Sequence, residues 1–218
     1  MIIKFFSFFK NIYGSHRIGA SAGKTLLWLW LRRDLTKING DLGIDLAGGD
    51  MDNKRFFSTK KYLCVDIDGG RLNRAHAKHP DAIIINSKIE DFLINENSEK
   101  GDVYLCTQTM GTNNLFDHDN TAQTIKSMYN HLRQGGSMVF NVACPKNFDH
   151  IKIEVGKLLE KKFENIDIKY YGAFHFSPTW MPGFLRLVIA YVMNFVPPIR
   201  TLFNLKRERI YFCCKNKI

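Results

Sequence analysis

The stretch Leu42-Gly-Ile-Asp-Leu-Ala-Gly-Gly49 decides the fold. It begins as an apolar run of the kind that forms a buried strand, and it ends in three small residues. Small residues directly after a strand let backbone amides approach a ligand closely. A second apolar run, Tyr62-Leu-Cys-Val65, ends at Asp66, where a carboxylate can accept hydrogen bonds from ribose hydroxyls. The two runs together predict a nucleotide-binding strand–helix–strand unit.

Further apolar runs alternate with amphipathic segments along the chain. We expect three more strands in the first part of the chain, at 82–85, 103–107 and 137–142, and two late strands at 166–174 and 209–214. Helices are expected between them at 70–78, 89–93, 119–133 and 151–163. The pattern predicts an α/β, Rossmann-like, doubly wound and mostly parallel seven-stranded sheet with helices on both faces. Ligands of such sheets bind beyond the carboxyl ends of the strands.

Residues 40–145 resemble the class I S-adenosylmethionine-dependent methyltransferases. Ile44-Asp-Leu-Ala-Gly-Gly49 is similar to their first motif, and Cys64-Val-Asp-Ile67 is similar to the tip of their second strand. Ser87-Lys-Ile-Glu-Asp-Phe92 resembles the third-strand motif, and Leu132-Arg-Gln-Gly-Gly136 resembles the turn before strand five.

The resemblance implies S-adenosylmethionine as cofactor. In the family, the residues at the positions of Asp66 and Ile67 hold the ribose and pack on adenine, and the third-strand motif flanks adenine. The cofactor-binding residues that the resemblance implies are Asp45, Ala47, Gly48, Gly49, Asp66, Ile67, Lys88, Ile89 and Thr107.

The chain departs from the family pattern at three positions. Ala47 replaces the first glycine, Met51 stands where many members have glycine, and Lys88 replaces the usual acid on the third strand tip. A family subgroup with a shortened first helix and an aromatic residue before the second strand is similar to this chain. The departures keep open a non-catalytic, binding-only copy of the fold.

Two other nucleotide sites fit less well. The loop after residue 46 lacks the third glycine of a dinucleotide fingerprint, and Asp50 and Asp52 would repel a pyrophosphate. The segment Gly19-Ala-Ser-Ala-Gly-Lys-Thr25 has one residue too few between its glycines for a phosphate-binding loop. It leads instead into a predicted helix over 25–34, whose Trp28 and Trp30 could cover the cofactor site or a membrane.

The net charge of +10 is concentrated at the two ends of the chain. Residues 1–40 and residues 176–218 each hold seven Lys or Arg and one acid, whereas the middle is close to neutral. Basic ends suit an anionic partner: a membrane surface, a phosphorylated substrate or a nucleic acid. We expect a basic, aromatic, helical segment at 1–40 and a methyltransferase-like domain at 41–218, with an apolar insertion at about 175–208.

The apolar stretch 187–199 is shorter than the ~20 residues that a spanning helix needs. The N-terminus lacks a clear secretory cleavage site. The five cysteines include no C-x-x-C pair, so we expect small buried thiols without disulfides or a metal site. Together these features predict a cytoplasmic protein, and the basic, aromatic ends leave open a peripheral position on the inner face of the membrane.

The predicted reaction is methyl transfer to a small-molecule, glycan or lipid-linked acceptor. A hydroxyl acceptor also needs a general base, for which His118, between two aspartates, and His175, before Ser177-Pro178, are candidates. An RNA-directed methyltransferase is an alternative because of the basic ends, although no nucleic-acid-binding module is recognisable. A non-catalytic binding subunit is the other alternative.

Overall fold

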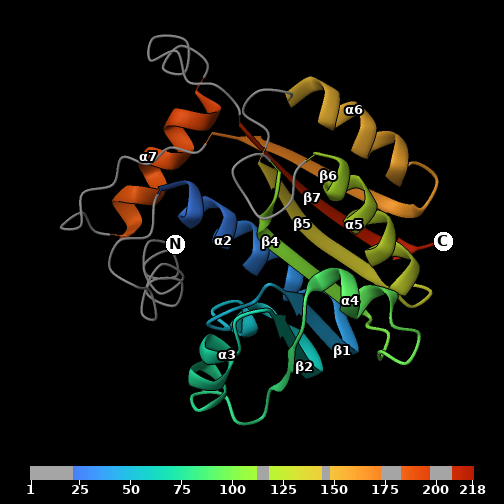
Figure 1. The fold of residues 1–218 in the computed structure, drawn as a ribbon. Helices are drawn as coiled ribbons and strands as arrows, with labels where there is room; N and C mark the ends of the chain where they lie inside the picture. Colours follow the sequence, from blue (N-terminus) through green and yellow to red (C-terminus); the bar gives the residue numbers. More distant parts are fainter. Residues whose placement is uncertain (1–21, 112–117, 144–147, 173–182, 197–207) are drawn as a thin grey trace.

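The apolar runs of the sequence form the strands of one sheet (Figure 1). The computed structural model describes residues 22–111, 118–143, 148–172, 183–196 and 208–218. Its elements, in chain order, are α2 (Ala22–Leu35), β1 (Asn39–Leu46), the 3-10 helix η1 (Lys54–Phe56), β2 (Ser58–Asp66), α3 (Gly69–His76), β3 (Ile83–Asn86), α4 (Ile89–Ile94), β4 (Val103–Gly111), α5 (His118–His131), β5 (Ser137–Ala143), α6 (Phe148–Leu159), β6 (Phe163–Tyr171), α7 (Gly183–Phe195) and β7 (Arg209–Lys217).

The seven strands lie in the order β3-β2-β1-β4-β5-β7-β6. The pairs from β3 to β5 are parallel, and β7 runs antiparallel to both of its neighbours. The chain order reverses between β1 and β4, so the carboxyl ends of these two strands meet at a topological switch point. The predicted doubly wound, mostly parallel seven-stranded sheet is confirmed.

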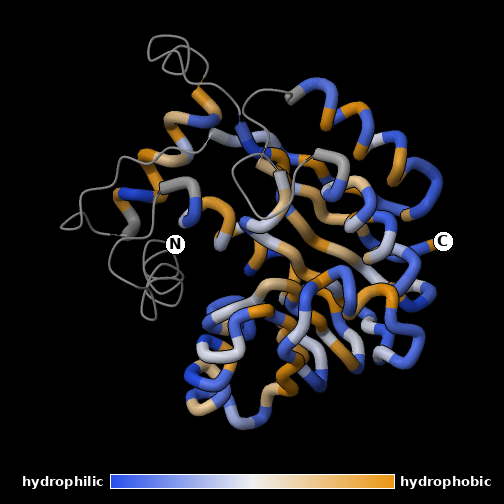
Figure 2. The backbone as a smooth tube through the Cα atoms, in the orientation of Figure 1, coloured by the Kyte–Doolittle hydropathy of each residue, from blue (hydrophilic) through white to orange (hydrophobic). Residues whose placement is uncertain are grey.

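Helices cover both faces of the sheet (Figure 1). The side chains of α4, α5 and α6 pack with Ile44, Val65 and Phe140 on one face. On the other face, α2 packs with Leu105 and Tyr211, while α3 covers β2 and β3 in a smaller cluster. Figure 2 shows hydrophobic residues along the central strands and along α7. The central strands are continuous apolar runs in the sequence because they are buried on both faces of the sheet.

Helix α2 is anchored to strand β7 by a buried carboxylate. Asp34 is only 4% exposed, and it accepts a hydrogen bond of 2.8 Å from the hydroxyl of Tyr211 in β7. Arg33 donates two further hydrogen bonds to the same carboxylate. A buried charge needs such partners to offset its loss of hydration. The contacts fix α2 against the sheet, with its first turn directed toward the ends of β1 and β2.

Some predicted ends shift for local reasons. The helix predicted to reach residue 163 ends at Leu159, because Lys161 takes a positive φ of 61° that stops the helix. Strand β6 then begins at Phe163, earlier than predicted. Strand β4 continues to Gly111 through a shift of register between Cys106 and Met110. This irregularity lies at the site described below.

The described cysteines are buried free thiols, as predicted: Cys64, Cys106, Cys213 and Cys214. Helix α7 contains residues 187–195 of the predicted apolar stretch and packs on α2, burying Leu187 and Ala190, whereas residues 197–199 of the stretch lie outside the described residues. Within the described ranges, no helix combines the length and hydropathy that a membrane crossing requires.

The division of the chain at residue 40 stays a prediction, and residues 1–21 lie outside the described residues.

Candidate functional site

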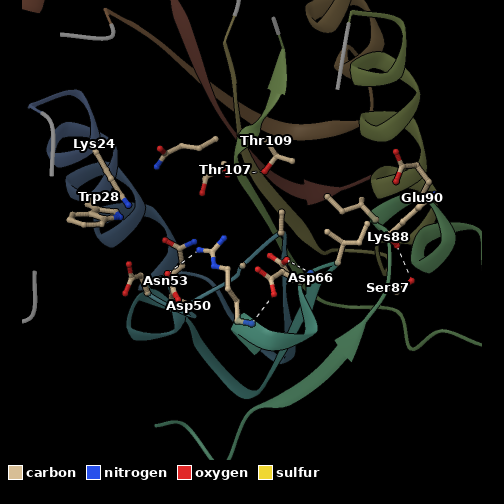
Figure 3. A pocket seen from close by; sticks show the side chains of 18 residues that line it. Lys24, Trp28, Asp50, Asn53, Asp66, Ser87, Lys88, Glu90, Thr107 and Thr109 are labelled. Atoms are coloured by element: carbon tan, nitrogen blue, oxygen red, sulfur yellow. Dashed lines mark hydrogen bonds and ion pairs between the residues drawn. The ribbon is translucent and has the colours of Figure 1, made fainter. Parts of the chain in front are cut away.

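A cavity of about 590 Å³ opens at the carboxyl ends of β1, β2, β3 and β4 (Figure 3). This is the edge of the sheet at which the sequence predicted a ligand, and the volume is within the usual range of small-molecule sites. The lining residues are Lys24, Trp28, Ala47, Gly48, Asp50, Asp52, Asn53, Asp66, Ile67, Asp68, Arg71, Ser87, Lys88, Ile89, Glu90, Thr107, Gln108 and Thr109.

The loop after β1 is tightly wound. Ala47, Gly49 and Met51 all have positive φ, at 55°, 49° and 58°. Only glycine adopts this region without steric cost, so two of the three residues are strained. At Gly48, an added Cβ would lie 2.6 Å from Sγ of Cys64, so the loop needs glycine there in order to pack on β2. The loop presents Ala47 and Gly48 to the cavity.

Met51 points away from the cavity. Its side chain is 1% exposed and packs with Tyr62, Cys64 and Leu72 under α3. Met51 is not among the residues that line the cavity. The departure from glycine at this position therefore leaves the space beside the loop open.

Asp66 joins the first loop to the tip of β2. Its Oδ2 accepts a hydrogen bond of 2.9 Å from the backbone N–H of Gly49, and its Oδ1 accepts one of 2.9 Å from Asp68 N–H. A carboxylate has about four acceptor positions, so two remain for a ligand. The next residue, Ile67, lines the cavity with 60% of its surface exposed. A fixed acceptor and an exposed apolar side chain thus lie side by side.

Asp45 lies beneath the loop, where it is fully buried. Its Oδ2 accepts hydrogen bonds from the hydroxyl of Tyr62 at 2.8 Å and from Nδ2 of Asn53 at 3.3 Å. Among the described residues, Oδ1 has no partner. Burial raises the pKa of Asp45 to about 7, although the two hydrogen bonds oppose this shift. Asp45 supports the loop from below, and its predicted contact with a cofactor stays a prediction.

Residues just after β3 and residues in the irregular part of β4 form another wall of the cavity. Lys88 and Ile89 line the cavity at the start of α4, and their predicted contact with a cofactor stays a prediction. Thr107 also lines it. Gln108 also lines the cavity, although the sequence analysis did not predict it. It has a positive φ of 60°, and its N–H donates a hydrogen bond of 2.8 Å to Oδ1 of the buried Asn141. This strained residue could not be predicted from the sequence, because the register shift of β4 depends on the pairing of β4 with β5.

Helix α2 supplies a side of the cavity through Lys24 and Trp28 (Figure 3). The sequence predicted such a role for Trp28, whereas Trp30 is buried against Tyr171 and Tyr211. Lys24 was not predicted; its spacing of four residues from Trp28 on one helix face could have indicated it.

The two histidines proposed as bases are not placed beside this cavity by any described contact. His118 begins α5, but its side chain lies outside the described residues, and so does the whole of His175. Both roles stay predictions. Within the described ranges, no cluster of three or more His, Cys, Asp or Glu side chains could hold a metal ion.

The sequence matches no family model and no curated protein. Solved structures do match the fold. The N-methyltransferase NodS from Bradyrhizobium japonicum WM9 aligns with a TM-score of 0.55 and 14% identity over 89% of this chain and 94% of NodS. The plantazolicin methyltransferase BamL, solved with a triazolic desmethylPZN analogue and SAH, aligns with a TM-score of 0.52 and 15% identity over 98% of this chain and 90% of BamL.

The cyclase SpnF aligns with a TM-score of 0.57 and 10% identity over 93% of this chain and 86% of SpnF. A fold that serves both methyl transfer and a cyclase does not by itself decide the chemistry. At these identities, the likeness shows the fold. The chain has the fold of the class I S-adenosylmethionine-dependent methyltransferases.

Proposed function

We propose that this protein binds S-adenosylmethionine in the cavity and transfers its methyl group to a small-molecule, glycan or lipid-linked acceptor. One observation carries the proposal: the Asp66 carboxylate, held by the amide of Gly49, borders the same cavity as the exposed Ile67. The pair offers an acceptor for sugar hydroxyls and an apolar platform for a flat ring. BamL, with the same fold, was solved with SAH, the demethylated product.

The residues of this cavity fit the cofactor. Asp66 would accept hydrogen bonds from the ribose, and Ile67 and Ile89 would flank the adenine. Gly48 leaves the backbone of the first loop open beside the methionine part of the molecule. Thr107 and the strained Gln108, in the irregular part of β4, line the same cavity, where an acceptor must approach.

Bound S-adenosylmethionine supplies the electrophilic methyl group. The contribution of the protein is then to hold the acceptor in line, to exclude water and, for a hydroxyl acceptor, to remove a proton. His118 and His175 remain our candidates for that base.

A lipid-linked acceptor is supported by the outer face of α7. Val188, Tyr191 and Phe195 form one stripe on this helix, with exposed fractions of 46%, 57% and 39%. Helix α7 packs on α2 through its other face, and α2 borders the cavity through Lys24 and Trp28. The basic ends of the chain favour an anionic membrane surface as the occupant of this stripe.

Calorimetric titration of the purified chain with S-adenosylmethionine and with SAH tests the proposal. We expect saturable binding of both and no binding of NAD, because Asp50 and Asp52 disfavour a pyrophosphate in the first loop. Absence of SAH binding would overturn the proposed function.

A further inference from the structure

Strand β4 contains a bulge where it borders the cavity. Residues 107–109 lie opposite the single residue Asn141 of β5, because the register of the two strands shifts between Cys106 and Met110. All of the residues 107–109 line the cavity. Bulges turn side chains away from the regular alternation of a strand, and they are common next to active sites.

Gln108, in the middle of the bulge, has a left-handed backbone conformation with a φ of 60°. Glycine adopts this conformation freely, whereas a residue with a Cβ adopts it at a steric cost. Two contacts hold the bulge: Gln108 N–H donates 2.8 Å to Oδ1 of Asn141, and the hydroxyl of Thr109 donates 3.0 Å to the carbonyl oxygen of Thr107. Asn141 is fully buried, so its position is fixed. Strained residues that are held in this way gather at ligand sites.

The side chain of Gln108 is exposed and belongs to the lining of the cavity. Among the described residues, its carboxamide has no hydrogen-bond partner. A carboxamide offers an acceptor oxygen and two N–H donors. Residues 107–109 carry no charge. This part of the lining therefore suits an uncharged ligand group that both donates and accepts hydrogen bonds.

The bulge lies on a part of the cavity that the proposed cofactor contacts leave free. Those contacts come from the ends of β2 and β3 for the nucleoside and from the loop after β1 for the methionine part, whereas β4 is the next strand beyond β1. In Figure 3, Thr107 and Thr109 lie between Trp28 on one side and Lys88 on the other. A second molecule bound beside the cofactor would therefore contact the bulge.

We propose that the carboxamide of Gln108 binds the methyl acceptor, that Asn141 is the positioning residue that holds Gln108, and that the acceptor carries an amide group. The inference rests on the proposed function and deepens it by naming the substrate class. An amide presents a donor and an acceptor that complement those of a carboxamide, and two hydrogen bonds fix the orientation that methyl transfer requires.

Benzamide and N,N-dimethylbenzamide serve as probes, titrated by calorimetry into the full chain saturated with SAH. The second probe keeps the carbonyl oxygen but has lost both N–H donors. We expect saturable binding of benzamide and about tenfold weaker binding of N,N-dimethylbenzamide, because the oxygen of Gln108 is then left without a donor.

Variants of Gln108 locate the contact. Gln108→Leu, which is of similar size, should weaken benzamide binding by about tenfold. Gln134→Leu is the matched control, since Gln134 is also exposed but borders a separate hollow near Gly136. Gln108→Gly should raise the urea midpoint of unfolding, because it relieves the strain, and should still weaken benzamide binding. A residue with a structural role alone would not give these opposite effects.

Variants of Asn141 test the positioning role. Asn141→Leu should weaken benzamide binding, whereas Asn141→Asp should retain most of it, because the aspartate keeps an oxygen for the N–H of Gln108. The amide nitrogen that Asn141→Asp removes has no partner among the described residues. Thermal unfolding shows whether each variant is folded, and Asn141→Ala replaces the leucine variant if that variant is not.

Four results would overturn the inference: no binding of benzamide, equal affinity for the two probes, competition between benzamide and SAH, or unchanged benzamide affinity in a folded Gln108→Leu variant. Equal losses in Asn141→Leu and in a folded Asn141→Asp variant would remove the positioning role. Failure of the proposed function would look different. The chain without cofactor would then bind benzamide through Gln108 while SAH itself did not bind.

Discussion

The backbone N–H of Gly49 donates a hydrogen bond of 2.9 Å to Oδ2 of Asp66, and this contact links the loop after β1 to the end of β2. The carboxylate is thereby oriented before any ligand arrives. Preorganised acceptors bind better because little ordering remains to be done on binding.

The first prediction concerns Asp66. We expect Asp66→Ala to weaken SAH binding by roughly 10- to 100-fold, which corresponds to the loss of charge-assisted hydrogen bonds to the ribose. Asp68→Ala is the matched control, because Asp68 also lines the cavity but caps α3 through Arg71 N–H. Calorimetry measures both affinities. Equal affinities for the wild type and a folded Asp66→Ala variant would refute the ribose assignment.

The second prediction concerns the strained Ala47. Replacement by glycine should stabilise the fold by up to about 1 kcal/mol, because the positive φ of 55° costs a residue with a Cβ about 1–2 kcal/mol while glycine adds some chain entropy. Ala77, with a φ of −58°, provides the comparison, and Ala77→Gly should destabilise the protein. Urea unfolding of the two variants gives the sign. A destabilised Ala47→Gly variant would contradict the strain argument.

The third prediction concerns pH and Asp45. Its pKa of about 7 in the folded protein exceeds the ordinary value of 3.8, so the folded state holds this proton more tightly than the unfolded chain. The resulting stabilisation is complete below pH 3.8 and is lost as the pH rises to about 7. It amounts to roughly 4 kcal/mol at most.

Asp45→Asn removes this titration and keeps an acceptor for Tyr62. The difference in unfolding free energy between the wild type and Asp45→Asn should therefore change in favour of the variant as the pH rises from about 4 to about 7. Urea unfolding at several pH values measures the difference, in which all other titrating groups cancel. A difference that is constant with pH would show that Asp45 titrates normally.

The fourth prediction concerns the apolar stripe of α7. The full chain should float with vesicles that contain phosphatidylglycerol at low salt, and the double variant Val188→Gln/Tyr191→Gln should lose most of this binding. Ile153 on α6 is 55% exposed and lies on the other face of the sheet, so Ile153→Gln is the control. Wild-type protein that stays at the bottom of the gradient would remove the membrane from the proposal.

The sequence predicted the sheet because its strands are buried on both faces and are therefore apolar throughout, as at 42–46 and 103–107. It also predicted Gly48 and Asp66 at the cavity, since their positions follow from strand ends. The direction of the Met51 side chain was not predictable, because that direction depends on a space under α3 that only the folded chain creates.

The same limit applies to Gln108 and Lys24. The strain of Gln108 arises from the pairing of β4 with β5 and from the amide contact to Asn141, two relations between distant parts of the chain. Lys24 reaches the cavity because α2 is anchored by Asp34 to β7. Local sequence patterns specify helices and strands, but the conformation of Gln108 and the position of Lys24 depend on how those helices and strands pack together.

The antiparallel strand β7 lies between β5 and β6, although it is made after both. During synthesis, β6 therefore cannot pair with the sheet until residues 209–217 have left the ribosome. The hydrogen bond between Asp34 and Tyr211 cannot form before then either. The half of the sheet that carries Gly48 and Asp66 needs none of these late residues for its strand pairs. The half of the sheet that borders the cavity can thus pair its strands first, and the final strand then fixes α2 beside that half.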